Sequence, residues 1–207
     1  MTDTKQKILD AAEKLFGEKG YAVTSLRHII SDAGVNLAAI HYHFGSKQGL
    51  LDQVIMRKAG PVNERRLELL DQFEAEAGSD PVSIEKILVA FILPAALLRE
   101  KHPEFAKLMG RVYSERLMPE IIRRNFQPVT ARFLAALRRA LPDFSAKELA
   151  WKTHFALGAM AHALTAQPEL NDSGPAEPPM AMATRLVAFL SNGFRAPATR
   201  EKEIEVK

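Results

Sequence analysis

The chain has 207 residues, of which 47% are hydrophobic and 26% are charged, and it contains no cysteine. These values are typical of a globular protein, and they exclude disorder over the whole chain, disulfide frameworks, thiolate metal sites and cysteine nucleophiles. The formal net charge of +3 permits binding to nucleic acid without requiring it.

The apolar segments are too short for a membrane protein. The amino-terminal residues are polar, and no apolar core of signal-peptide length follows them. The longest strongly apolar stretch, Ile87 to Leu98, is interrupted by Pro94 and falls short of the roughly 20 residues that a membrane span needs. We therefore expect a cytoplasmic protein without a membrane partner.

Four helical patterns follow one another near the amino terminus. Between Asp3 and Gly20 the apolar residues recur at i, i+3, i+4, i+7 and i+8, which predicts an amphipathic helix. Glycine can end a helix in a left-handed turn, and Ser, Thr or Asn can cap the start of one. The later helices are accordingly expected to begin after Thr24 or Ser25, after Asn36 and after Ser46, and to end at Gly34 and Gly45 for the second and third.

The rest of the chain is also predicted to be helical. Gly60-Pro61 marks a kink or a restart of the fourth helix. Further helices are expected at about 82–100, 103–117, 118–141, 145–167 and 180–194, with a loop over 171–179. No alternation of the β type is present. We predict an all-α fold, with a three-helix head over residues 1–50, a larger helical body over 51–195 and a polar tail over 196–207.

The segment from Leu26 to Phe44 fits a helix-turn-helix. That motif needs two short helices joined by a tight turn with glycine and held by interlocking apolar side chains. Gly34 supplies the turn, and the interlocking residues are Ile30, Val35 and Ile40. The second helix is then expected to lie in the major groove of DNA, where its outward side chains reach base edges.

The predicted DNA contacts fall into two groups, one for the phosphates and one for the bases. Residues at helix starts and exposed cations are expected to hold phosphates and set the register. Arg27 and His41 are the expected direct readers of bases, and DNA shape contributes to specificity. The residues expected to contact phosphates are Thr24, Ser25, Arg27 and Lys47. The outward or apolar residues of the second helix are Leu37, Ala38, Ala39, His41 and Tyr42.

The run from Gly34 to Lys47, GVNLAAIHYHFGSK, follows Thr24-Ser25-Leu26-Arg27 and resembles the DNA-binding head of the tetracycline-repressor (TetR) family. The likeness covers residues 5–51. Ile30 stands where the family usually has a small residue, and His41 stands where tyrosine or asparagine is more usual. The resemblance implies a homodimeric transcription factor, usually a repressor, that a small molecule bound in the body releases from an inverted-repeat operator.

The body resembles the family mainly in the number and length of its helices. Residues 151–162, WKTHFALGAMAH, are similar to a helix of family members associated with acyl or fatty-acid metabolism. Small side chains in this segment allow another helix to approach closely, and the resemblance implies that this helix and the last one form the family's four-helix dimer interface; tight packing within one chain is the alternative. The predicted interface residues are Trp151, Phe155, Gly158, Ala159, His162, Leu186, Phe189 and Leu190.

Ligand sites are mostly apolar with a few placed polar groups. Aromatic and long apolar residues of the body fit this description, although the same residues can simply form a packed core. An apolar or amphipathic ligand is expected from this lining. The candidates are Phe91, Leu97, Phe105, Met109, Tyr113, Phe126 and Phe133, with His154 and His162 as polar contacts.

No metal or cofactor is expected. His41 and His43 are two residues apart and diverge on a helix, and no His-Glu-x-x-His pattern or phosphate-binding glycine loop occurs. Three functions remain: a ligand-responsive DNA-binding repressor, a DNA-binding regulator gated by a protein partner, and an all-α enzyme or interaction module with an incidental helix-turn-helix. The first is favoured, and an enzyme is not expected.

Overall fold

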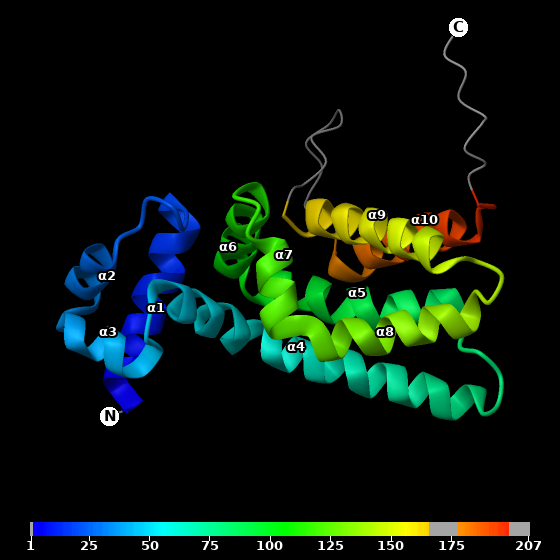
Figure 1. The fold of residues 1–207 in the computed structure, drawn as a ribbon, viewed down its shortest axis with the longest axis horizontal. Coiled ribbons are helices and arrows are strands. Elements are labelled where there is room, and N and C mark those ends of the chain that lie inside the picture. Colours follow the sequence, from blue (N-terminus) through cyan, green and yellow to red (C-terminus); the bar gives the residue numbers. More distant parts are fainter. Residues whose placement is uncertain (1, 166–177, 199–207) are drawn as a thin grey trace, which may run out of the picture.

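The computed structural model describes residues 2–165 and 178–198, and every regular element in these ranges is a helix (Figure 1). Residues 166–177 and 199–207, which hold most of the predicted loop and tail, lie outside the described residues. No helix of the described ranges is long and apolar enough to cross a membrane. The helices are α1 (Thr2–Lys19), α2 (Leu26–Ala33), α3 (Leu37–Phe44), α4 (Lys47–Ala77), α5 (Ile84–Lys101), α6 (Pro103–Ser114), α7 (Met118–Ile121), the π-helical turn η1 (Ile122–Phe126), α8 (Gln127–Ala140), α9 (Ala146–Thr165) and α10 (Pro179–Arg195).

The head helices start and stop at the residues that the sequence predicts. Gly34 has a φ of 65°, in the left-handed region that favours glycine, and its N–H donates to the carbonyl of Ile30. Each helix start is capped by a side-chain oxygen that accepts a backbone N–H. The caps are Ser25, which accepts from His28 at 3.2 Å, Asn36, which accepts from Ala39 at 3.0 Å, and Ser46, which accepts from Gly49 at 3.0 Å.

One continuous helix, α4, connects the head to the body. Pro61 lies inside this 31-residue helix, so the predicted restart at Gly60-Pro61 is wrong. A proline crowds the residue before it, and a Cβ on that residue adds to the crowding. Gly60, the residue before Pro61, has no Cβ and so adds none of this crowding. The predicted domain boundary at residue 50 therefore falls inside a helix.

Two apolar cores lie on either side of the middle of α4. The head core joins buried residues of α1, α2 and α3 to the first turns of α4, and it also takes in Phe105, Leu108 and Val112 of α6. The body core joins α5, α8 and α10 to the rest of α4. Because α6 packs on α1, the body reaches into the core of the head.

A π-helical turn interrupts the segment that the sequence predicts as one helix over 118–141. Pro128 has no N–H to donate to the carbonyl four residues earlier, so the regular α-helical ladder cannot continue through this point. The turn widens to five residues in η1, and α8 begins after Phe126. Single π-helical turns occur frequently at functional sites.

Gly49 permits the tight packing of α3 against α4. A Cβ at position 49 would overlap the carbonyl oxygen of Phe44, the last residue of α3, so a side chain there forces α3 to move. We expect Gly49→Ala to lower the free energy of unfolding, measured by urea denaturation at one protein concentration. The matched control is Gly193→Ala in α10, where a Cβ meets nothing within 4 Å. That change should stabilise the protein by about 0.5–1 kcal/mol through helix propensity alone, and equal effects of the two changes would contradict the packing argument.

Candidate functional site

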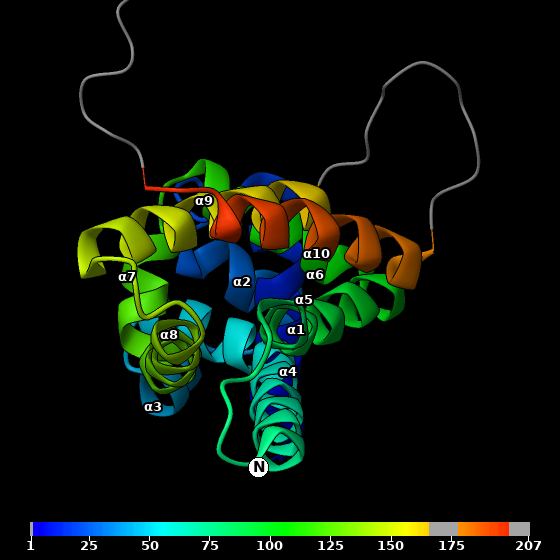
Figure 2. The same ribbon diagram turned by 90° about the vertical axis from the view of Figure 1, so that its right-hand side faces the viewer.

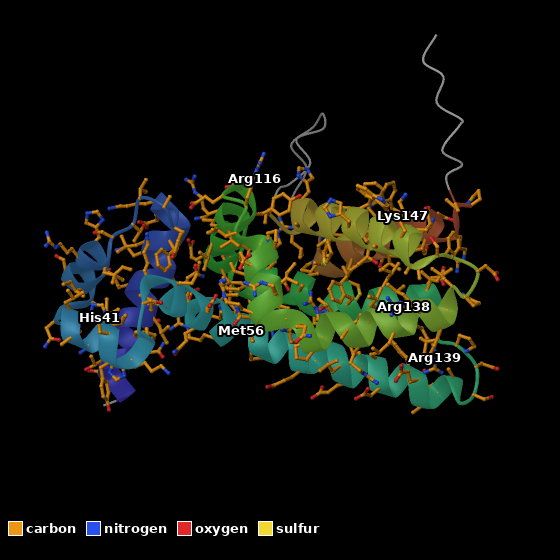
Figure 3. The ribbon with its side chains drawn as sticks, in the orientation of Figure 1. His41, Met56, Arg116, Arg138, Arg139 and Lys147 are labelled. Atoms are coloured by element: carbon orange, nitrogen blue, oxygen red, sulfur yellow. The ribbon has the colours of Figure 1, made fainter. Side chains whose placement is uncertain are left out.

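The outer surface of the head is formed by α3. Leu37 is 40% exposed and Tyr42 is 74% exposed, and Ala38 and His41 are also exposed. Figure 3 places His41 on the side of the head that faces away from the body. Ile40, by contrast, is fully buried in the head core. The helix therefore presents to solvent four of the five side chains that the sequence predicts to face DNA.

Ala39 is the exception on this helix, because it is partly buried and packs against the head core. The prediction for the Thr24 side chain as a phosphate contact is wrong. Thr24 is fully buried, and its hydroxyl donates to the carbonyls of Gly20 at 2.7 Å and Leu15 at 3.2 Å. It closes the end of α1 instead, and Ser25 is the residue that caps α2.

The two cationic residues predicted to contact phosphates, Arg27 and Lys47, differ in exposure and in their contacts within the chain. Arg27 is exposed and has no hydrogen-bond or ion-pair partner in the described part of the chain. Lys47 is half-buried: its Nζ donates to the carbonyl of Ala22 at 3.4 Å and lies 4.2 Å from the centre of the Tyr21 ring. Burial lowers the pKa of Lys47, and the charge of Glu115 acts in the opposite direction. The Lys47 ammonium group is therefore engaged by the α1–α2 loop, whereas the Arg27 side chain is available to a phosphate.

The loop between α1 and α2 is held by a carboxylate from the body. Glu115, in the turn after α6, accepts the backbone N–H of Tyr21 at 3.0 Å and that of Ala22 at 2.9 Å. Gly20 has a φ of 90°, and a Cβ on it would overlap the Glu115 carboxylate. Only a glycine at position 20 therefore allows the contact. Sequence reasoning missed this tie, since its partners are more than 90 residues apart.

A second tie joins α4 to η1. The Arg124 guanidinium donates to both oxygens of the Asp52 carboxylate, from Nε at 2.9 Å and from Nη2 at 3.1 Å, and the Asn125 side chain adds a bond to the same group at 3.1 Å. The hydrogen bonds that Arg124 donates to Asp52 raise the pKa of Arg124. Asp52 lies only five residues after Lys47, at the head end of α4, so η1 is connected directly to the base of the head.

A cavity of about 810 Å³ lies between the elements that make these ties and the rest of the body. Volumes of this order are typical of small-molecule sites. Its walls come from α4, α5, α6, α7, η1, α8 and α9. Among its lining residues are six predicted ligand contacts: Phe91, Phe105, Met109, Tyr113, Phe126 and His154.

Three other predicted ligand contacts do not line the cavity. Leu97 is 39% exposed on the outside of α5, and His162 is exposed on α9. Phe133 is buried in the body core behind Phe91, with the two ring centres 4.9 Å apart in an edge-on arrangement. Helical spacing gives the same pattern for a cavity wall and for the packed layer behind it, which is why the sequence did not separate them.

Sequence reasoning also missed the charged residues of the cavity, namely Arg66, Arg99 and Arg116. Arg66 is 6% exposed and sits in the inward stripe of α4 between Val62 and Leu70, which are both buried. Arg66 lies four residues after Val62 and four before Leu70, so its position in the apolar stripe can be recognised from the sequence and indicates a buried charge. Burial lowers the pKa of Arg66 to about 10.

The predicted dimer surface is only partly exposed. Helices α9 and α10 lie side by side on one face of the body (Figure 2). Three large apolar residues of these helices are exposed: Trp151 at 52%, Phe155 at 63% and Phe189 at 69%. His162 is exposed, and Gly158 and Ala159 are half-buried. Leu186 and Leu190 are buried in the body core of the same chain, so the prediction for these two as interface residues is wrong.

Loss of the Glu115 carboxylate should free the loop between α1 and α2. In Glu115→Ala we expect the Tyr21 and Ala22 amides to exchange hydrogen about 10- to 100-fold faster, because a hydrogen bond to a charged group contributes about 1.5–3 kcal/mol. The measurement is hydrogen exchange followed by NMR. The control is Glu68→Ala, which removes an exposed pair with Arg65 on α4 and should leave both amides unchanged. Unchanged exchange in the first variant would show that the tie does not hold the loop.

Comparison with known families gives two matches along the chain. Residues 8–54 match the family model described as bacterial regulatory proteins, tetR family, and residues 89–193, half of the chain, match the model described as tetracyclin repressor-like, C-terminal domain. The first match covers the helix-turn-helix and the second covers most of the cavity and the α9–α10 face.

Among curated proteins, the HTH-type transcriptional regulator AcrR of Shigella flexneri is 31% identical over 99 residues, which are 48% of this chain and 44% of that protein. The biofilm operon icaADBC HTH-type negative transcriptional regulator IcaR of Staphylococcus aureus (strain Newman) is 41% identical over 51 residues, 25% of this chain and 27% of that protein. The matched part thus spans less than half the length of these relatives.

Solved structures are similar over nearly the whole chain. A TetR family transcription regulator from Shewanella sp. PV-4 superposes with a TM-score of 0.63 at 16% identity, covering 92% of this chain and 97% of that one. A TetR-like regulator from Rhodococcus sp. RHA1 gives 0.59 at 18% identity, covering 94% and 97%. At these identities the likeness shows the fold.

Proposed function

The chain belongs to the tetR family of bacterial regulatory proteins, and from this premise we propose that it is a homodimeric repressor that a small molecule in the body cavity releases from an inverted-repeat operator. The family consists of DNA-binding transcriptional regulators and not of enzymes. Binding to a bacterial operator would place the protein in the cytoplasm. Control by a ligand is supported mainly by one short segment, residues 113–126. This segment lines the cavity, and its Glu115 and Arg124 also bind the α1–α2 loop and the head end of α4.

Recognition of DNA is supported by the chemistry of the exposed face of the head. Leu37 and Ala38 offer apolar contact to thymine methyl groups, and the His41 ring is exposed at the same surface. His41 Nδ1 is 3.2 Å from the carbonyl oxygen of Gly45, which orients the ring and leaves Nε2 outward for a base or phosphate. With few polar readers on α3, DNA shape would carry part of the specificity.

Control by a ligand is supported by where the two ties are anchored. Arg116, Met118 and Pro119 line the cavity directly after Glu115. Ile122 and Phe126 line it on either side of Arg124. A ligand that displaces these wall residues would move both Glu115 and Arg124, and with them the α1–α2 loop and the head end of α4. The spacing of the two heads in a dimer would then depart from the roughly 34–36 Å that successive turns of the major groove require.

Dimerisation is supported by the apolar face of α9 and α10. Three aromatic side chains on this face are more than half exposed, and two of them, Trp151 and Phe155, have ring centres 5.6 Å apart. Large exposed apolar patches often mark protein interaction sites. Twofold dimers are the commonest oligomers, and a twofold axis matches an inverted repeat. A protein partner on this face is the competing occupant, and the oligomeric state decides between the two.

Removing Arg27 should weaken operator binding at all sequences. An inverted-repeat fragment is first selected from genomic DNA, and its binding is measured by fluorescence anisotropy. We expect Arg27→Ala to bind this fragment more weakly. The slope of the logarithm of the binding constant against the logarithm of the salt concentration should be smaller by about 1 for each head. The control is Arg138→Ala on α8, an exposed arginine on the body far from the head (Figure 3). If Arg27→Ala keeps the wild-type affinity and slope, the assignment of the DNA face fails.

A charge on the aromatic face should separate the dimer. Phe155→Asp combined with Phe189→Asp places two carboxylates at the proposed interface, where an unpaired charge is strongly unfavourable. We expect monomers in sedimentation velocity, with unchanged helix content in circular dichroism. Val23→Asp is the control, since Val23 is an equally exposed apolar residue, at 67%, in the head. If the double variant dimerises with the same affinity as the wild type, the interface lies elsewhere.

A further inference from the structure

Arg66 is a buried cation without an anionic partner. The neighbouring arginines of α4 are paired, Arg57 with Asp10 and Glu13 and Arg65 with Glu68. Arg66 is more deeply buried than either, yet no carboxylate lies within ion-pair distance of it in the described ranges. With a pKa of about 10 it is still protonated at neutral pH. A buried charge that lacks a counter-ion is unfavourable, so its presence calls for a reason.

Part of that reason is structural. Arg66 Nε donates to the carbonyl of Phe91 at 2.8 Å, and Nη1 donates to the Asn63 side chain at 3.0 Å. Phe91 lies one turn before Pro94, which stands inside α5 and has no N–H to donate. The guanidinium also stacks on the Phe91 ring, 4.1 Å from its centre. These contacts use two of the three nitrogens and a face of the group, and among the described residues Nη2 has no acceptor.

The charge of the cavity has one sign. Arg66 and Arg99 both line it, and Arg99 Nη1 donates only to the carbonyl of Ala163, at 3.3 Å. Arg116 lines it from the turn at the end of α6, at the edge of the body (Figure 3). No aspartate or glutamate is among the described residues that line it. Most of the remaining wall is apolar, with Phe91, Phe105, Met109 and Phe126 among the side chains on it.

We propose that the cavity takes an apolar molecule that carries one carboxylate, and that Arg66 binds this carboxylate through Nη2. The proposal rests on the proposed function, in which the cavity is the effector site. The apolar wall accommodates the body of the molecule, and the buried guanidinium gains the counter-ion that the chain does not supply. A single carboxylate fits best, because Arg66 is the one deeply buried cation among the described lining residues and has one nitrogen to offer.

The test compares probes that share a body and differ in charge. Binding of decanoate, decan-1-ol and decylammonium, and of 2-naphthoate with 2-naphthol, is measured on the full chain by calorimetry. We expect at least one carboxylate to bind about 10- to 100-fold more tightly than its uncharged counterpart, the ratio that a hydrogen bond to a charged group provides. Decylammonium should bind most weakly. Equal affinity of acid and alcohol, or no binding of either acid at about 1 mM, would overturn the proposal.

Variants locate the effect on Arg66. In Arg66→Gln the preference for the acid over the alcohol should disappear, while binding of the alcohol shows that the cavity is still formed. Arg66→Lys keeps the charge and should restore most of the preference. Arg65→Gln, an exposed change one residue away on α4, should leave it unchanged. A preference that survives in Arg66→Gln would overturn the assignment of the carboxylate to Arg66.

Operator release is measured separately on the same probes. If a carboxylate binds with the expected preference and leaves the operator complex intact, the proposed ligand control is wrong and the anion site stands. If an alcohol releases the operator as well as its acid does, ligand control stands and the anion site is wrong.

Discussion

The hydrogen bonds that Glu115 accepts from the loop between α1 and α2 join the head to the body. The contact requires a glycine at position 20, whose backbone conformation is open to few other residues and whose missing side chain makes room for the carboxylate. It also requires that α6 pack closely on α1. An ideal Cβ at Gly17 would lie 3.6 Å from the backbone nitrogen of Leu108, an ordinary contact distance, so α6 approaches α1 to within reach of a small side chain at this position. Of the two glycines, Gly20 is the one whose missing side chain the contact between head and body uses.

The second constraint is the continuity of α4. Its first turns are buried in the head core, its later turns are buried in the body core, and it bears Asp52 at the head end and Arg66 at the cavity. Helix α4 is continuous from Asp52 to Arg66, with Pro61 between them, so the two residues belong to one element. Under the proposed ligand control, the cavity would act on the head by two routes, through the turn that bears Glu115 and through α4 itself. Both routes end at the loop and the base that position α2 and α3.

The sequence predicts best where a feature is set by neighbouring residues. The caps at Ser25, Asn36 and Ser46 and the glycine at position 34 depend on contacts three or four residues away, so they can be derived from spacing. Thr24 has the same local chemistry as a cap, but its hydroxyl is taken up by carbonyls at the end of α1, a choice that depends on how the loop folds back.

The body shows why the rest is harder to predict. Leu186 and Leu190 are apolar at helical spacing, as an interface residue would be, and only the position of α5 shows that they face their own core. The cavity has the same ambiguity, since a wall residue such as Phe91 and a core residue such as Phe133 follow one pattern. Polar residues that break an apolar stripe carry more information. Arg66 is such a residue, and its place between Val62 and Leu70 is visible without a structure.

Arg66 connects the two halves of the proposed function. Its hydrogen bond to Phe91 joins α4 to α5, and its charge is the strongest attraction that the cavity offers to an anion. A carboxylate bound to Nη2 would pull on the guanidinium, whose Nη1 is bonded to the Asn63 side chain, and would so shift the turn of α4 that bears both residues. If that shift lowers the affinity for DNA, linkage requires the operator complex to bind the anion more weakly by the same factor. The apolar wall would then supply affinity that both states share, and the guanidinium would supply the difference between them. Control by such a ligand therefore rests on the energetics of one buried charge, because a purely apolar molecule that binds both states equally shifts nothing however tightly it binds.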